Sequence, residues 1–275
     1  MISPFEPKRL ASAGWLTCGL ILVTGLLAAG QTQRAKKPAK VAATAKPQPP
    51  TAPAEQAVPF HGGEKLSYRV MWSKFSVNAG TLDLLVAQHG NFFGHPAWHF
   101  QARAATVQTM RLVYPLDDQF DSYTEASKLA SLQYEMYLHE QGKQENDSWR
   151  MTVDGAPAPP DATAARVVPG TRDPIGFLYA ARAADWKSTP ELHTPVFDGH
   201  HLYQVDAKLG VPADHVTVPA GNFQASRIDI RVSERGEEVA DTNFSLWIAQ
   251  DATRTPVLIE ASLPVGTARV ELTSH

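Results

Sequence analysis

The chain has 275 residues, of which 43% are hydrophobic and 19% charged, a composition that supports a packed core and excludes disorder along the whole chain. Its single cysteine, Cys18, lies in an apolar stretch near the N-terminus, which excludes disulfides, cysteine-ligated zinc and a cysteine nucleophile from the rest of the chain. The formal net charge of −3 is uneven: residues 31–60 carry +4 and residues 61–275 carry −8. Nucleic acids require a clustered basic face, so we expect no nucleic-acid partner.

The first 30 residues have the pattern of a targeting segment. Lys8 and Arg9 precede about twenty largely apolar residues that end on small residues, which is typical of a secretory signal peptide. The same run is long enough to span a bilayer, so residues 1–30 are expected to be a signal peptide or an N-terminal membrane anchor. The small-residue ending favours cleavage. Lipidation of Cys18 is disfavoured, because the main apolar run follows this cysteine instead of preceding it.

Residues 31–60 are rich in Pro, Ala and Lys and show no hydrophobic period. This composition predicts a disordered, semi-extended linker. The linker provides reach across an envelope if the leader is retained, and only then is the domain tethered to a membrane. In either case we expect the protein to be exported to the periplasm or cell envelope.

From residue 64 onward, apolar residues recur at every second position, which is the period of a strand with one buried face. We count about ten such segments, separated by turn sequences such as those at 140–143, 219–222 and 264–266. Short connections favour antiparallel neighbours. The sequence therefore predicts a mainly β domain over residues 61–275, as a large antiparallel curved sheet or an incompletely closed β-barrel.

Residues 173–186 interrupt the strand pattern. Asp173 is a favoured N-cap residue, and Pro174 suits the first position of a helix. Four apolar residues then fall on one stripe at helical spacing: Phe177, Leu178, Ala181 and Ala184. We expect one helix here, with this stripe packed against the apolar face of the sheet.

The stretch NFSLWIAQDATRTPVLIEASL, residues 243–263, alternates on both sides of a turn. Asp251 is a typical turn residue and can pair with Arg254, while Pro256 suits the start or edge of a strand, where its missing N–H is harmless. We interpret this stretch as a hairpin that closes one edge of a concave sheet.

Two groups of titratable residues are candidates for chemistry. The Asp-Gly-His-His sequence at 198–201 is better explained as a turn than as a metal site, because adjacent strand residues point to opposite faces. Asp117, Asp118 and Asp121 can supply paired carboxylates for hydrolysis, but no partner acid or base is identifiable and an acidic loop is favoured. No nucleophile, P-loop or dinucleotide motif is present. We therefore expect a non-enzymatic protein with no metal and no cofactor.

Aromatic residues lie on or near the inward positions of several predicted strands. Core packing is the default role for such residues. The alternative is that some of them line a cavity, since aromatic and aliphatic walls with few charges suit an acyl or isoprenoid ligand. The candidate cavity-lining residues are Tyr68, Trp72, Trp98, Phe100 and Trp149.

The order of features along the domain resembles that of the domain of unknown function 3108, found in exported bacterial proteins. The similar segments are GEKLSYRVMWSKFSVNAGTLDL at the front and, further on, VFDGHHLYQV, VTVPAGNFQASRIDI, LWIAQDATRTPVLIE and PVGTARVEL. The family's fold is similar to the half-open barrels of the LolA and LolB lipoprotein carriers, which cradle acyl chains. The resemblance implies no catalytic residue. One departure is the presence of His200 and His201 where a basic residue is expected after the Asp-Gly turn.

The leading hypothesis is an exported, non-enzymatic protein whose concave sheet binds a lipid-like ligand or a partner segment. It requires an apolar cavity. A hydrolase of envelope polymers is the first alternative and requires a carboxylate near a histidine in a cleft. A structural scaffold that pairs through sheet edges is the second, and requires a filled interior and a bare edge strand.

Overall fold

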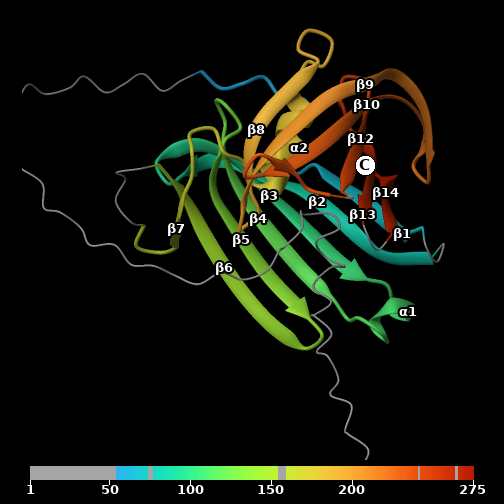
Figure 1. Ribbon diagram of the computed structural model, residues 1–275, viewed down its shortest axis with the longest axis horizontal. Helices are drawn as coiled ribbons and strands as arrows, with labels where there is room; N and C mark the ends of the chain where they lie inside the picture. The colour runs from blue at the N-terminus through green and yellow to red at the C-terminus, as the bar shows by residue number, and fades with distance from the viewer. Residues whose placement is uncertain (1–53, 74–76, 154–158, 241, 264–265) are drawn as a thin grey trace, which may run out of the picture.

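The computed structural model of the protein describes residues 54–73, 77–153, 159–240, 242–263 and 266–275. Within these ranges, strands with one apolar face pair into a single large curved sheet (Figure 1). The prediction of a mainly β, curved and incompletely closed sheet is confirmed.

The sheet contains fourteen strands. The first half of the chain contributes β1 (Lys65–Trp72), β2 (Val77–Phe92), β3 (His95–Thr106), β4 (Asp117–Glu125), β5 (Ser131–Glu140), β6 (Lys143–Thr152) and β7 (Thr163–Arg166). The second half contributes β8 (Glu191–Phe197), β9 (Leu202–Val218), β10 (Gly221–Glu234), β11 (Glu237–Glu238), β12 (Asn243–Ala249), β13 (Pro256–Leu263) and β14 (Gly266–Ser274).

The order of the strands in the sheet follows their order in the chain, in two series that run from the middle of the sheet to its two edges. β1 pairs with both β2 and β14, so the first and last strands are neighbours in the middle of the sheet. From there β2 to β7 continue to one edge and β14 back to β8 to the other, with β11 adding a short pair to β10. The parallel β6–β7 pair is the exception to antiparallel order among these strands.

Bulges in the longest strands help to bend the sheet. The register shifts between Val86 and Gln88 in β2, and again around Arg227 where β10 pairs with β9. Such irregularities increase local twist and bend a strand. The bent sheet brings β2–β4 opposite β9–β13 across a concave inner face.

One end of this half-open barrel is tied together by backbone hydrogen bonds. Ser131, the first residue of β5, donates its N–H to the carbonyl of Thr171. The Arg172 N–H donates to the carbonyl of Pro195, and the Phe197 N–H donates to the carbonyl of Arg172. Residues 171–172 thus connect β5 to the edge strand β8, and we call this the closed end.

The predicted number of strands was too low. β4 buries Ser122 and Thr124 on its inner face, and β8 buries Thr194. These polar residues interrupt the apolar alternation from which strands are recognised in a sequence. The polar residues are buried here because they hydrogen-bond to one another and to the segment that leads into the helix.

The predicted helix is present as α2 (Pro174–Ala183) and lies against the inner face, in contact with β3, β4 and β8 (Figure 1). Its burial is broader than the predicted stripe, because Tyr179 and Ala180 are buried along with Ala181, whereas Phe177 is only half-buried. A second helix, α1 (Gln108–Arg111), is a single turn between β3 and β4 that the sequence did not predict.

The folded domain begins before residue 61. The Gln56 N–H donates to the carbonyl of Ala126, and Phe60 is packed into the core, so the end of the expected linker belongs to the domain. The expected leader, residues 1–30, and the linker up to residue 53 lie outside the described residues. Among the residues that are described, no helix is both long and apolar enough to cross a bilayer.

Candidate functional site

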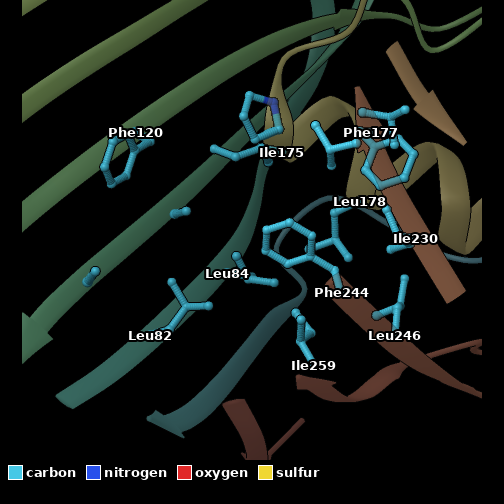
Figure 2. Close-up of a pocket in the computed structure, with 15 residues that line it drawn as sticks. Leu82, Leu84, Phe120, Ile175, Phe177, Leu178, Ile230, Phe244, Leu246 and Ile259 are labelled. Atoms are coloured by element: carbon cyan, nitrogen blue, oxygen red, sulfur yellow. The ribbon is translucent and has the colours of Figure 1, made fainter. Parts of the chain in front are cut away.

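An apolar pocket lies between α2 and the inner face of the sheet (Figure 2). Its volume is about 100 Å³. Three walls surround it, one from β2–β4, one from the first turns of α2 and one from β9–β13. The lining residues are Leu82, Leu84, Ala102, Ala104, Phe120, Pro174, Ile175, Phe177, Leu178, Val205, Ile230, Val232, Phe244, Leu246 and Ile259.

Small side chains on β3 leave the space on the first wall. Strand alternation points Ala102 and Ala104 to the inner face, where they pair in register with Leu84 and Leu82 of β2. A methyl group reaches much less far into the interior than the ring of Phe120 on the neighbouring strand. The hollow therefore follows from alanine at two successive inward positions of one strand.

The opposite wall is built from branched and aromatic side chains on three antiparallel strands. Ile230 pairs in register with Phe244, and Leu246 pairs with Ile259. Leu246 is 1% exposed, whereas Phe244 is half-buried, so the wall is anchored in the core and its Phe244 edge reaches solvent. Figure 2 shows these side chains turned toward the leucines of β2.

A buried carboxylate fixes the start of α2. Asp173 accepts hydrogen bonds from the N–H groups of Ile175 and Gly176 and from the hydroxyls of Ser122 and Ser131. Complete burial raises the pKa of Asp173, although these four hydrogen bonds oppose the shift. The cap therefore ties the helix to β4 and β5, and it sets the position of Ile175 in the pocket.

A buried ion pair holds the other end of α2. The guanidinium of Arg182, 1% exposed, makes a two-pronged contact with the carboxylate of Glu64 and donates to the backbone carbonyls of Thr253 and Arg254. Bidentate arginine–carboxylate contacts of this kind also fix orientation. Helix, N-terminal segment and β12–β13 turn are thereby joined at one point.

The predicted pairing of Arg254 with Asp251 is not what the structure shows. Arg254 instead donates to the carbonyls of Ala183 and Ala184 at 3.0 Å each, where the end of α2 leaves carbonyls unsatisfied. Asp251 accepts from the N–H and hydroxyl of Thr253 within the turn. The predicted β12–β13 hairpin is present, and its turn also caps the helix. Its expected place at an edge of the sheet is wrong, because β13 pairs with β14 and β12 pairs with β10, so both strands lie inside the sheet.

All of the residues that line the pocket are apolar. Apolar cavities of about 150 Å³ bind a benzene-sized molecule, and sites for larger ligands span about 300–1,000 Å³. A pocket of about 100 Å³ therefore suits one apolar group, such as the end of an acyl chain, and not a whole lipid. Its walls offer no group for acid–base or nucleophilic chemistry.

The five predicted cavity-lining residues are all buried elsewhere on the sheet, and none of them is among the residues that line this pocket. Trp98 and Phe100 pack with Phe60 near the middle of the inner face. The hydroxyl of Tyr68 donates to a backbone carbonyl of β13 at 2.8 Å. Their role in ligand binding stays a prediction.

The remaining two predicted residues lie far apart in the sheet order. Trp72 packs in a small cluster with Ala79, Ala261 and Ala268 at the end of β1. Trp149, on β6, packs against Tyr134 and Phe197 on the other side of the molecule. The structure thus places Tyr68, Trp98, Phe100 and Trp149 in one large core cluster, and Trp72 in a separate small cluster.

The three aspartates do not form one site. Strand alternation in β4 places Asp118 on the face of Phe120, and places Asp117 and Asp121 on the outer face. Asp117 forms an ion pair with Arg111, which holds the pKa of the carboxyl below its ordinary value. These positions give no shared carboxylate pair.

Asp121 contacts a histidine, as the hydrolase hypothesis requires, but its oxygens are already occupied. His99 lies 2.5 Å away, and the side-chain amides of Gln101 and Gln119 donate at 3.0 and 2.6 Å. Burial raises the pKa of Asp121, and these hydrogen bonds outweigh it and lower the pKa overall. The ring of His99 stacks on Tyr123 at 4.5 Å, so the group has the arrangement of a structural network.

Residues 198–201 form the turn that the sequence favoured. One oxygen of Asp198 accepts the N–H groups of His200 and His201 at 2.8 and 2.7 Å. Burial raises the pKa of Asp198 against the effect of these two bonds. Across the described part of the chain, no group of three or more His, Cys, Asp or Glu side chains is placed to hold a metal ion.

Comparison with protein families gives one match that covers most of the chain. Residues 67–273 match the family DUF3108, described as a protein of unknown function. The chain belongs to this family. No curated protein matches the sequence.

Three solved structures are similar to the chain at low sequence identity, and the first of them supports a beta-barrel-like fold. A beta-barrel-like protein of the family DUF1849 from Brucella abortus is similar with a TM-score of 0.51 at 9% identity, over 76% of this chain and 94% of that one. A protein described as a lipoprotein from Parabacteroides distasonis gives 0.38 at 8% identity, over 80% and 99% of the chains. An exported protein with a YmcC-like fold from Bacteroides fragilis gives 0.33 at 11% identity, over 80% and 98%.

Proposed function

We propose that this DUF3108 protein is a non-enzymatic protein of the bacterial periplasm or cell envelope that binds an apolar, lipid-like ligand. The pocket between α2 and the sheet is the observation that carries the proposal, because all of its walls are apolar and it is not filled by the protein's own side chains. Export is supported by the leader pattern of residues 1–30.

The size of the pocket favours a chain-like ligand. One apolar end enters between Leu84, Ile175 and Leu246, while the rest of the molecule extends past the half-buried Phe244 toward solvent. The uniformly apolar lining gives affinity in proportion to the apolar area that is buried, and little selectivity among head groups. Fatty acids and other single-chain lipids fit this description.

The two alternatives are less well supported by the described residues. A hydrolase needs a base with a free lone pair facing a substrate, whereas Asp121 is saturated by three neighbours. An edge-pairing scaffold needs a filled interior and free edges. The pocket leaves the interior unfilled, and part of the outer edge of β8 bonds to Arg172.

The proposal is tested by filling the pocket. In Ala104→Phe a ring enters the pocket, whereas in the control Ala105→Phe the same ring is added to the next residue, on the outer face. We expect native mass spectra of the full chain to show uptake of added fatty acid, with about tenfold weaker affinity in Ala104→Phe and no change in Ala105→Phe. Absence of uptake in the unmodified protein, or equal uptake in both variants, contradicts the proposal.

A further inference from the structure

Two adjacent apolar side chains stand out on the surface. Leu112 is 87% exposed and Val113 is 75% exposed, while the next most exposed large hydrophobic residue of the described chain, Val168, is 49% exposed. Single exposed apolar residues are common and need no explanation. A neighbouring pair at such exposure, in an acidic and otherwise well-packed domain, requires one.

The backbone around this pair is held in a fixed conformation. The N–H groups of Val113 and Tyr114 both donate to the carbonyl of Met110, and the Leu116 N–H donates to the hydroxyl of Thr106. These bonds close the connector between β3 and β4 into a tight loop. The pair is thus presented rigidly at the tip of the connector.

The other apolar residues of the connector point inward. Tyr114 is 5% exposed and Leu116 is 4% exposed, and Met110 packs against the cluster around Trp72. Leu112 and Val113 are thus the only large apolar residues of the connector that are largely exposed to solvent. We call Leu112 and Val113 the apolar tip.

The charges beside the tip are balanced. Arg111 and Asp117 form an ion pair at 2.8 Å, and the mutual contact raises the pKa of the guanidinium and lowers that of the carboxyl. Both groups stay ionised near neutral pH and cancel in net charge. Such a surface has no basic patch that would attract anionic lipids, and it is compatible with binding to a zwitterionic lipid surface.

The small area of the tip decides between possible occupants. A stable protein interface buries about 800 Å² on each partner from some twenty or more residues, which two side chains at the end of a loop do not supply. Insertion into a bilayer interface requires only a few apolar groups, because affinity grows with the apolar area that enters the lipid. If the leader is retained, the apolar run of residues 10–29, outside the described residues, also holds the chain at a membrane.

We propose that Leu112 and Val113 insert into the apolar region of a zwitterionic lipid surface and dock the domain on it. The same strand links this tip to the pocket: β3 lines the pocket at Ala104 and ends at Thr106, about 7 Å further along at the usual rise of a strand. The inference does not depend on the pocket being occupied.

The test places an environment-sensitive fluorophore at the tip of the full chain. Cys18→Ser removes the native thiol, and Val113→Cys is labelled with a nitrobenzoxadiazole dye. The matched control carries the dye at Val168→Cys, an exposed valine at the start of the loop between β7 and α2. The preceding residue, Val167, donates its N–H to the carbonyl of Thr152 at the end of β6. Both proteins are mixed with phosphatidylcholine–phosphatidylethanolamine vesicles that contain lipids with a doxyl quencher on the acyl chain. Because both carry the same N-terminal segment, any difference between them reports on the tip.

We expect the tip dye to shift to shorter wavelength and to lose roughly half of its fluorescence, and the control dye to change little. Adding Leu112→Asp to the tip-labelled protein should abolish the quenching, Leu112→Phe should preserve it, and raised salt should have no effect. Equal signals at both dye positions, or a tip signal unaffected by Leu112→Asp, overturn the inference. Uptake of fatty acid measured without vesicles is a separate result, so failure of docking and failure of the pocket proposal are distinguishable.

Discussion

The inner face of the sheet has two regions of opposite character. Around Phe100 the space is filled by aromatic rings. Tyr179 of α2 stacks on Phe100 with 3.8 Å between the ring centroids, and Phe60 contacts both rings edge-on. A few residues further along β3, Ala102 and Ala104 face a hollow with aliphatic walls. Both regions lie under the same helix and on the same strands.

The two regions show how one helix can contribute both to stability and to a binding pocket. The filled region, with the buried contacts of Asp173 and Arg182, fixes α2 on the sheet. Because the helix is held there, its Phe177 and Leu178 need not fill the space beneath them, and the pocket persists beside a well-packed core. Changes to the two regions should therefore have separable effects on stability and on binding.

The largest effect is expected at the helix anchor. Arg182→Met leaves the mostly buried carboxylate of Glu64 without its partner, and breaking such a pair costs about 3–5 kcal/mol. Urea denaturation should show this loss, and the double variant Arg182→Met/Glu64→Met should recover part of it. Lys65→Met, which breaks an exposed pair with Asp83, serves as the control and should cost at most about 1 kcal/mol. Equal losses in Arg182→Met and Lys65→Met would contradict the anchoring role.

A matched pair of truncations compares the two regions directly. Phe100→Ala, at 0% exposure, opens a cavity in the filled region and should lower the free energy of unfolding by about 3 kcal/mol. Phe244→Ala, at the half-buried edge of the pocket, enlarges an existing opening and should cost about half as much. Thermal and urea unfolding measure both. If the two costs are the same, the pocket edge is packed as tightly as the core and the comparison fails.

The N-cap of α2 is expected to have an intermediate effect. Asp173→Ala removes the cap and leaves the hydroxyls of Ser122 and Ser131 without their acceptor, for a loss of about 2 kcal/mol. Asp173→Asn retains an oxygen for the N–H groups of Ile175 and Gly176, so it should be milder. Because this cap positions one wall of the pocket, fatty-acid uptake should weaken in the alanine variant as well. A stable Ala variant with full uptake would show that the cap does not position the wall.

The last expected effect is a pH dependence of stability. Burial, with a contribution from the nearby Glu140 carboxyl, raises the pKa of Asp118 to about 7, although a hydrogen bond from the His139 N–H opposes the shift. An unfolded aspartate has a pKa of about 3.9, so the folded state binds the extra proton and stability falls as pH rises from about 4 to about 7. Asp118→Asn keeps the acceptor for His139 and removes this titration, so its stability relative to the unmodified protein should rise from pH 5 to pH 8, by up to about 3 kcal/mol at about 1.4 kcal/mol per pH unit. A difference that is constant with pH would rule out titration of Asp118 in this range.

Much of the fold follows from local patterns. The two-residue period identifies most strands, and Asp173 with Pro174 identifies the start of α2. The hairpin at 243–263 also forms, although inside the sheet and not at its edge. These features depend on residues that are close to one another in the chain, so they can be predicted from the sequence alone.

The pocket depends on contacts that local patterns do not contain. Alternation shows which side chains face inward, but not which of them meet across the curved sheet. Phe100 and Ala102 are both inward residues of β3, and only the position of α2 makes one a core residue and the other a pocket wall. The pair of Glu64 and Arg182, 118 residues apart, has no local signature either.

The most direct measurement is a methyl-resolved NMR titration of the protein with decanoate. If the hollow is the binding site, methyl signals of Leu84, Ile175 and Leu246 should shift in a saturable manner, while those of Leu66 and Leu272 in the filled core stay in place. Saturable shifts confined to the pocket methyls would support apolar-ligand binding as the function of this site. Shifts confined to the core methyls, or no saturable shift at all, would contradict it.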